Sequence, residues 1–238
     1  MVDFQTLEAF DDVHRLIVVA AHPDDLETIC GGTIALLTQR GVTVFSVNCT
    51  LGDIGTQDAA TTRPAVATAR LTEAEDAARL LGIQQVFSLG HHDGELVADL
   101  ELRAQVARLY RITQADTLIT FDPFWTGQVH PDHRAAGQAA LDAYMPSKMP
   151  LYRPEQLREP GAGLGVLKRV FLFSTSREPD VFVDVSAVYE TKLAACMAHH
   201  SQFPNGLESL EWLQRWDEER GAALGVSRAE SFRTMEVW

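Results

Sequence analysis

The sequence predicts an α/β fold: a Rossmann-like, mostly parallel β-sheet with helices on both faces. Two patterns in the 238 residues predict it. Short runs of apolar and β-branched residues are typical of strands buried on both faces of a parallel sheet, and they occur at residues 16–21, 42–49, 86–89 and 117–121. Helix-like stretches separate these runs. Strands that alternate with helices form βαβ units with right-handed crossovers, which build a parallel sheet.

The expected helices of this alternation have recognisable ends. Three lie at residues 26–39, 63–81 and 131–144, and another follows residue 99. Gly41 and Gly82 close the first two, because glycine readily adopts the left-handed conformation that ends a helix. Asp99 is a typical N-cap residue. Pro131 stands at the first position of its helix, where its fixed φ and missing N–H are well tolerated.

The last third of the chain has a different character. Seven proline and glycine residues fall within residues 146–165, so we expect a long irregular loop, which in compact domains is usually a lid or a binding loop. Two more strands are expected at 170–174 and 181–185, and two helices around 187–199 and 207–221. Trp212 and Trp216, four residues apart, are expected to make core or subunit contacts. No repeat or linker is visible, so residues 1–238 are expected to form one domain.

Composition excludes several classes of partner. Lys and Arg total 20 against 33 Asp and Glu, a formal net charge of −13, which disfavours nucleic acid and anionic membrane surfaces. The three cysteines are far apart, which indicates buried thiols in a reducing compartment. The longest apolar stretch, residues 16–21, is too short for membrane insertion, and no secretory signal is visible. We therefore expect a cytoplasmic protein; the sequence leaves open whether it forms a homo-oligomer.

Two histidine- and aspartate-containing motifs follow predicted strands. His22-Pro-Asp-Asp25 comes directly after the first strand, and His130-Pro-Asp-His133 follows the fourth strand and its loop. Both place a proline where a helix begins. Parallel strands end at one edge of the sheet, where ligands bind at the point at which the strand order reverses. If the fourth strand neighbours the first, the two motifs face each other there.

The residue types of these motifs indicate a metal site. Two histidines and one carboxylate, with a fourth position open, are the usual ligands of hydrolytic zinc. His22, Asp25 and His133 supply that set. The expected cofactor is Zn²⁺, with Fe²⁺ or another divalent metal as the alternative in the cell.

One carboxylate and one imidazole remain beside the predicted metal. Hydrolysis needs one group that takes a proton from the attacking water and another that stabilises or protonates the intermediate. Asp24 is the candidate base, and His130 is the candidate acid or oxyanion partner. Asp132 is expected to hold His130 in the required tautomer, as carboxylates behind catalytic imidazoles do.

The same motifs resemble the PIG-L/LmbE family of zinc N-deacetylases. Residues 21–25 with Gly31-Gly32-Thr33 are similar to the first motif of that family, and residues 130–133 to its second. The resemblance implies an LmbE-like fold and metal-dependent removal of the N-acetyl group from an N-acetylglucosamine conjugate. It implies the same ligands, Asp24 as general base and His130 as the electrophilic imidazole. Leu26 stands directly after the paired aspartates, where many members of the family have Glu. In this position the sequence resembles the branch of the family that acts on thiol-cofactor precursors.

Substrate contacts are predicted mainly from this resemblance. Arg70 begins an Arg-x-x-Glu segment, Asp93 follows the third strand, and His199 lies in the late segment 198–202. Each is similar to a family segment near the site. Trp125, between the fourth strand and His130, is a candidate stacking platform for a sugar ring. The loop at 146–165 is expected to shape the aglycone side of the pocket.

Two other functions fit parts of the pattern. Clustered Asp and His at a sheet edge also suit a mononuclear or dinuclear metal phosphoesterase. A non-catalytic amino-sugar-binding protein that retains the pocket is the third hypothesis.

Overall fold

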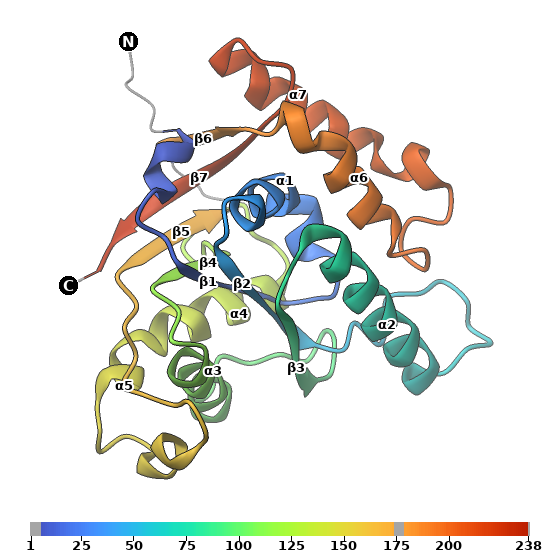
Figure 1. Ribbon diagram of the computed structural model, residues 1–238. Helices are drawn as coiled ribbons and strands as arrows, with labels where there is room; N and C mark the ends of the chain where they lie inside the picture. Colours follow the sequence, from blue (N-terminus) through green and yellow to red (C-terminus); the bar gives the residue numbers. More distant parts are fainter. Residues whose placement is uncertain (1–5, 174–178, 238) are drawn as a thin grey trace.

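One seven-stranded sheet organises the computed structural model, which describes residues 6–173 and 179–237. The strands are β1 Arg15–Ala20, β2 Thr43–Thr50, β3 Gln85–His91, β4 Thr117–Phe121, β5 Arg169–Phe173, β6 Val181–Asp184 and β7 Ala229–Glu236. Their order across the sheet is β3-β2-β1-β4-β5-β7-β6 (Figure 1). The first five strands pair in parallel, which confirms the predicted fold class. β1 and β4 are neighbours, as the facing of the two motifs requires.

The antiparallel end of the sheet was only partly predicted. β7 pairs antiparallel with β5 on one side and with β6 on the other. The sequence analysis predicted β5 and β6 but missed β7. Within β7, Phe232 is a fully buried aromatic residue that packs edge-on against Phe171 and Phe10, whereas charged and small polar residues fill most of the other positions. The weak apolar pattern explains why the strand was missed.

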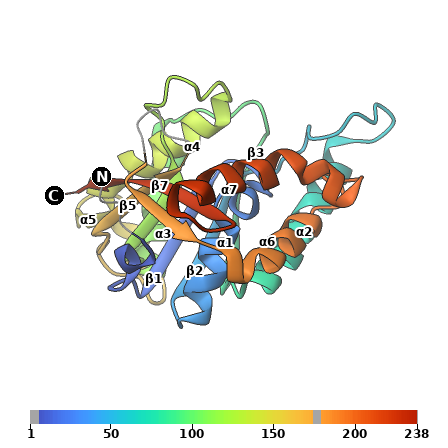
Figure 2. The same ribbon diagram turned by 90° about the horizontal axis from the view of Figure 1, so that it is seen from above.

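Helices cover both faces of the sheet, as predicted. The α-helices are α1 Asp25–Gln39, α2 Arg63–Leu81, α3 Leu100–Thr113, α4 Pro131–Asp142, α5 Tyr144–Lys148, α6 Tyr189–Met197 and α7 Glu211–Leu224. Four short 3₁₀ turns are η1 Leu7–Phe10, η2 Pro154–Arg158, η3 Ser186–Val188 and η4 Gly206–Leu210. α1, α2 and α6 pack against one another, and α3, α4 and α5 form a second group (Figure 2). Among the described residues, no helix is both long and apolar enough to cross a bilayer.

Helix α1, which carries the first motif, is bent in its second turn. Cys30 has non-helical dihedral angles (φ −137°, ψ 15°), so the backbone N–H groups just after it lose their partners within the helix. The carboxylate of Glu230 accepts hydrogen bonds from Gly32 and Thr33 at 2.9 and 2.7 Å. A Cβ atom on Gly32 would lie 2.7 Å from Val185. Close packing at the bend therefore explains the glycine at position 32.

A buried cation, Lys192, balances the carboxylate of Glu230. Lys192 Nζ lies 2.8 Å from Glu230 and 2.7 Å from Asp217, and all three residues are almost fully buried. The two carboxylates more than offset the effect of burial and keep the pKa of Lys192 above its usual range. Removing one member would leave a buried charge without its partner, which is strongly destabilising. The cluster ties α6, α7 and β7 to the bend of α1.

The segment at 146–165 lies at the edge of the sheet opposite the motifs. The buried guanidinium of Arg111, near the end of α3, donates hydrogen bonds to backbone carbonyls at residues 146, 147, 149 and 153. α3 and α4 run back from the carboxyl edge to the amino edge before this segment starts. The prediction that it shapes the substrate pocket is therefore wrong. It is also less irregular than expected, since it includes the end of α5 and η2.

Trp212 and Trp216 do not lie in the core. They are 45% and 36% exposed on α7, with ring centroids 5.9 Å apart. The core half of the prediction for these residues is wrong, because α7 turns this side toward solvent; the predicted subunit contact stays a prediction.

Candidate metal centre

The pairing of β1 with β4 brings the two motifs together. His22 follows β1, Asp25 begins α1, and His133 lies in the first turn of α4. His133 Nε2 is 3.3 Å from His22 Nδ1 and 3.3 Å from Asp25 Oδ1. His22 Nδ1 is 3.4 Å from Asp25 Oδ2. Side chains more than 100 residues apart in the sequence thus point their ligand atoms at one small volume.

The spacing of these atoms fits a divalent cation. Ligands about 2.1 Å from a tetrahedral zinc ion lie about 3.4 Å from one another, close to the separations between His22, Asp25 and His133. Backbone N–H groups of Ala21 and His22 hold Asp25 Oδ2 at 3.1 and 2.8 Å, which fixes the carboxylate in place. Imidazole nitrogens and a carboxylate placed in this way are donors that suit divalent ions such as zinc or iron(II).

Two overlapping groups also have ligand atoms within 4.8 Å of one another: His22 with His130 and His133, and His22 with Asp93 and Asp132. The two ring nitrogens of His22 face different groups. Its Nε2 lies 3.1 Å from Asp93 Oδ1 and 3.3 Å from Asp132 Oδ2, whereas its Nδ1 faces Asp25 and His133. An imidazole that binds a metal through one nitrogen usually donates its other N–H to a carboxylate. Asp93 and Asp132 fit that supporting position.

The electrostatics of the centre favour positive charge. Burial disfavours a charged His22, but the carboxylates of Asp132, Asp25 and Asp93 more than compensate and raise the pKa of His22 to about 12. His133, beside Asp25, helps to hold the pKa of that carboxyl well below its usual range despite burial. A position that holds a proton so tightly between carboxylates also attracts a metal cation, which competes with protons for the same nitrogen.

Asp24 has an unusual backbone conformation. It is the N-cap of α1 and has a φ of 114°, in the left-handed region that non-glycine residues rarely adopt. Such residues cluster at functional sites, where the surrounding structure holds them in place. Burial raises the pKa of Asp24 to about 6, although Arg70 acts in the opposite direction. A carboxyl with this pKa can both accept and return a proton near neutral pH.

His130 stands on the other side of the cluster. Its ring lies 4.5 Å from that of His133 and 4.6 Å from that of His22, measured between centroids. Its Nδ1 accepts the backbone N–H of Asp132 at 3.3 Å and so caps α4, which leaves Nε2 as the N–H donor of the neutral ring. Burial, with His133 and His22 nearby, lowers the pKa of His130. The ring is therefore a neutral hydrogen-bond donor.

Asp132 does not hold His130 through its carboxylate, as the sequence analysis predicted. Its Oδ2 accepts the Gly94 N–H at 2.6 Å and its Oδ1 the Leu96 N–H at 3.3 Å, and it faces His22. The reason is that α4 begins beside the loop after β3, which directs the side chain inward. The tautomer of His130 is set instead by the backbone N–H of Asp132, which donates to His130 Nδ1.

Arg70 is a buried residue that organises the site. It is 3% exposed and donates hydrogen bonds to the carbonyls of Gly52 and Pro23. Its Nη2 lies 3.0 Å from Asp24 Oδ2. A Cβ atom on Gly52 would collide with the guanidinium. The predicted direct substrate contact finds no support, because the terminal nitrogens of Arg70 already face protein oxygens.

The other predicted substrate residues lie in different surroundings. Asp93 is buried and faces His22. His199 is fully buried, with Nε2 3.4 Å from Glu27 Oε2, so the predicted contact with substrate is wrong: α6 ends beneath the first turn of α1. Trp125 is half-buried and lines a pocket of about 390 Å³ together with Phe182 and Trp216.

Sequence reasoning assigned no role to Asp53 or Glu27. Asp53 is 2% exposed and accepts hydrogen bonds from the Arg63 side chain and the Asp93 N–H. The carboxylate thus joins the loop after β2 to the loop after β3. Its place between Gly52 and Gly55 was the available signal. Glu27 had no such signal, because a glutamate in a first helical turn is most often exposed.

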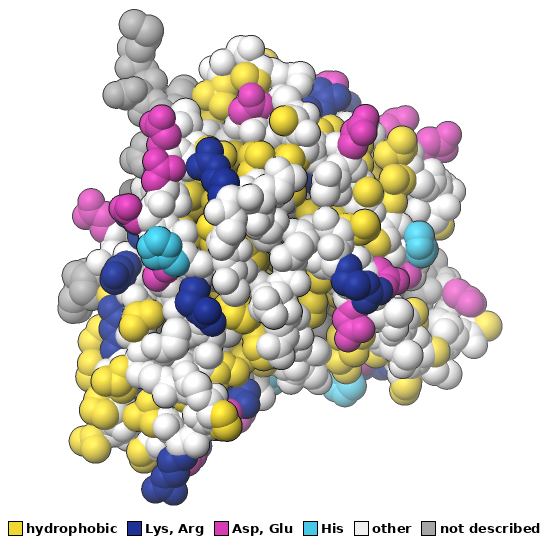
Figure 3. Space-filling model, in the orientation of Figure 1, with side chains coloured by type: hydrophobic (Ala, Val, Ile, Leu, Met, Phe, Trp, Pro, Cys, Tyr) yellow, Lys and Arg dark blue, Asp and Glu magenta, His cyan; other side chains and the backbone are white. Residues whose placement is uncertain are grey.

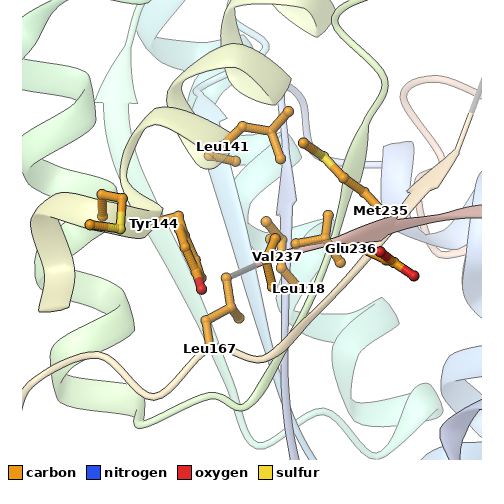
Figure 4. Close-up of a pocket in the computed structure, with 10 residues that line it drawn as sticks. Leu118, Leu141, Tyr144, Leu167, Met235, Glu236 and Val237 are labelled. Carbon is orange, nitrogen blue, oxygen red and sulfur yellow. The ribbon is translucent and has the colours of Figure 1, made fainter.

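A separate apolar pocket of about 130 Å³ lies away from this centre. Its labelled lining residues include Leu118, Tyr144, Leu167 and Met235 (Figure 4). Of the described residues that line it, Glu236 is the only acidic one and none is a histidine. The pocket has no constellation for hydrolysis.

Comparison with known proteins gives matches over most of the chain. The family model described as PIG-L, GlcNAc-PI de-N-acetylase, matches residues 17–144. A diacetylchitobiose deacetylase of Thermococcus kodakarensis is 33% identical, with 88% of this chain and 78% of that protein covered. A probable N-acetyl-alpha-D-glucosaminyl L-malate deacetylase 2 of Bacillus cereus is also 33% identical, with coverages of 84% and 94%. The solved structure of N,N'-diacetylchitobiose deacetylase from Pyrococcus horikoshii superposes with a TM-score of 0.89 and 32% identity, with 95% of this chain and 85% of that chain covered.

Proposed function

The chain belongs to the PIG-L family of de-N-acetylases, and from this premise we propose that it hydrolyses the acetamido group of an N-acetylglucosamine conjugate to acetate and a free amine. One observation carries the proposal: His22 Nδ1 and His133 Nε2 lie 3.3 Å apart, and each lies 3.3–3.4 Å from one of the two carboxylate oxygens of Asp25. Asp24 and His130 stand beside them. We further propose that the whole chain acts as one domain, since its described strands form one sheet.

His22, Asp25 and His133 would hold the metal, for which we propose Zn²⁺. A divalent ion in this position supplies Lewis acidity, which polarises the amide carbonyl and makes water a better nucleophile near neutral pH. Asp93 and Asp132 orient His22 by accepting from its Nε2. The protein thereby sets which nitrogen of His22 faces the metal.

Asp24 acts as the base in the proposed mechanism. It takes a proton from the water whose oxygen attacks the carbonyl carbon. As the C–N bond breaks, it returns that proton to the departing nitrogen, which leaves as the amine while acetate remains. Its pKa of about 6 suits both roles. Arg70 holds the carboxylate at 3.0 Å.

His130 stabilises the negative charge that develops on the carbonyl oxygen. Its Nε2–H is available because Nδ1 accepts the Asp132 N–H. A preorganised donor in a partly buried site typically contributes about 3–4 kcal/mol to such a step.

The proposal is tested by incubating the purified chain with a panel of N-acetylglucosamine conjugates and measuring released acetate. We expect release from at least one conjugate, with one tightly held metal ion per chain. Absence of acetate with measurable sugar binding would point to the non-catalytic sugar-binding hypothesis. Two tightly held ions per chain and hydrolysis of phosphate esters would point to the phosphoesterase.

A further inference from the structure

From the side chains around the metal centre, we infer that this chain selects conjugates whose aglycone is uncharged and offers an apolar face, and disfavours conjugates with an anionic aglycone. The inference rests on the proposed function. It concerns the part of the substrate beyond the acetamido sugar, on which the named relatives differ: one acts on a disaccharide and another on a malate glycoside.

Three exposed apolar side chains lie in loops at the edge of the sheet that carries the centre. Ile54, Val97 and Val129 are 51%, 66% and 84% exposed, and we call them the apolar rim. They come from three different loops, those that follow β2, β3 and β4. An isolated exposed apolar residue needs no explanation. Three that gather at the edge of one polar site indicate a surface that is covered when the site is in use.

Each member of the apolar rim is close to a group of the centre. The Cδ1 atom of Ile54 lies 3.1 Å from the point where a Cβ on Gly94 would be, and the Gly94 N–H donates to Asp132. Val97 follows Leu96, whose N–H also donates to Asp132. Val129 directly precedes His130. The rim is therefore within reach of a group attached to a sugar whose acetamido carbon lies at the metal centre.

Among the described residues, the arginines near the centre are held by carboxylates or by backbone carbonyls. Arg63 pairs with Asp53 and Glu95 at 2.7 and 2.8 Å. Arg233, near the end of β7, pairs with Asp122 at 2.8 Å. Of the other described arginines of this edge, Arg70 is buried against Asp24, and the exposed Arg134 donates to the Gln128 carbonyl at 2.7 Å.

The lysines are also remote from the rim. Lys148 belongs to α5 and Lys168 donates its backbone N–H to Asp116 at the amino edge. Lys192 is fully buried in its own ion-pair cluster. Apolar side chains gather at the lower left of Figure 3, in the region where Figure 1 draws α5.

The charge of the centre itself repels an anion. Four carboxylates surround it: Asp24, Asp25, Asp93 and Asp132. Arg70 and a divalent ion together do not neutralise all four, and the chain as a whole has a formal net charge of −13. A dicarboxylate aglycone at the rim would therefore lose hydration beside four carboxylates.

The direct test compares N,N'-diacetylchitobiose with N-acetylglucosaminyl malate. We expect kcat/KM to be at least about tenfold higher for the neutral conjugate. The ratio of the two kcat/KM values should decrease as added salt screens the repulsion. Binding of the two deacetylated products, which cannot turn over, should show the same preference by calorimetry. Equal or tighter binding of the glucosaminyl malate would overturn the inference even if acetate is released. Absence of acetate release would instead count against the proposed function, while the product affinities still decide the aglycone.

A paired set of variants locates the effect. Val129→Lys places a cation on the rim and should raise kcat/KM for the malate conjugate about tenfold relative to chitobiose. Leu151→Lys makes the same change of charge at a side chain that is 90% exposed on the opposite edge, and should leave the ratio within about twofold. Equal effects of the two variants would contradict a local role of the rim. If Val129→Lys alters the oligomeric state in solution, the rim is an interface between copies of the chain, and the aglycone assignment fails.

Discussion

Asp24 and Arg70 form the pair on which the proposed chemistry depends most at the level of single residues. Asp24 sits in a left-handed conformation at the start of α1, and Arg70 reaches it from α2 while also bonding the carbonyls of Gly52 and Pro23. One guanidinium thus fixes two loops and the candidate base. A basic side chain whose two terminal nitrogens both contact protein oxygens is better suited to positioning a catalytic group than to binding substrate.

Asp24→Asn is expected to retain the metal and lose activity by roughly three orders of magnitude, because asparagine cannot accept the proton. Asparagine tolerates the left-handed conformation, so the fold should persist. The measurements are kcat and metal content, with Asp58→Asn, on an exposed loop, as the control that should behave like wild type. Near-normal turnover of Asp24→Asn would remove it from the mechanism.

The pH dependence of kcat/KM should report the same residue. Asp24 must be ionised to act as base, and its pKa is raised to about 6 by burial. Activity is therefore expected to fall as the pH drops through about 6 and to level off above it. A rate profile that is flat between pH 5 and pH 8 would disagree with this assignment.

Arg70→Lys separates positioning from substrate binding. Lysine keeps the charge but lacks the planar, multiply donating guanidinium. If Arg70 positions Asp24, kcat should fall by about tenfold or more with little change in KM. A large rise in KM at unchanged kcat would restore the predicted substrate contact. Metal content should remain that of wild type in either case.

At the scale of elements, the bend in α1 connects the site to the far side of the sheet. The non-helical Cys30 frees backbone donors that Glu230 on β7 accepts, and Lys192 on α6 balances that carboxylate. The last strand of the chain thereby anchors the helix that begins with Asp25. Because β7 lies between β5 and β6, this anchor depends on the antiparallel end of the sheet.

Adjacent glycines test the packing of that bend. Gly32→Ala should destabilise the protein by about 1–3 kcal/mol, since its Cβ would lie 2.7 Å from Val185. Gly31→Ala is the matched control: its Cβ would make ordinary contact, 3.4 Å from Lys192, and alanine is favoured over glycine within helices. In denaturant unfolding, the free energy of unfolding of Gly32→Ala should be well below that of wild type, and that of Gly31→Ala should be close to it. The opposite ranking would contradict the described packing.

At the scale of the whole molecule, the metal centre joins two strand–helix junctions. His22 and Asp25 belong to the first, and His133 belongs to the second, 111 residues after His22. A bound ion therefore stabilises the contact between the two halves of the parallel sheet. Without it, several buried carboxylates depend on His22 and Arg70 for compensation.

Removal of the metal should lower the midpoint of thermal unfolding. A ligand at 100 times its dissociation constant contributes about 2.7 kcal/mol to the folded state. Chelation should therefore reduce Tm, and added zinc should restore it. His133→Ala, which lacks one ligand, should show little response to the chelator. An identical Tm with and without chelator in the wild-type chain would argue against a resident ion.

The sequence alone determined the alternating parallel fold and the pairing of the two motifs. Apolar strand runs and helix-end residues are local signals. Pro131 stands at the first position of α4 as predicted, whereas Pro23 precedes the N-cap Asp24 of α1, so the expected place of that proline was wrong. His22, Asp25, Asp24, His130 and His133 were identifiable because their spacing reflects a helix N-terminus at the edge of a strand.

Only the tertiary structure decided which groups support these metal-binding and catalytic residues. Asp132 turned to His22 instead of His130, Arg70 became a buried anchor, and Glu230 capped a helix nearly 200 residues earlier in the chain. The loop at 146–165 lies at the opposite edge because α4 carries the chain back across the sheet. These relations join residues distant in sequence, and local patterns cannot predict them, since they depend on strand order and on which buried charges meet.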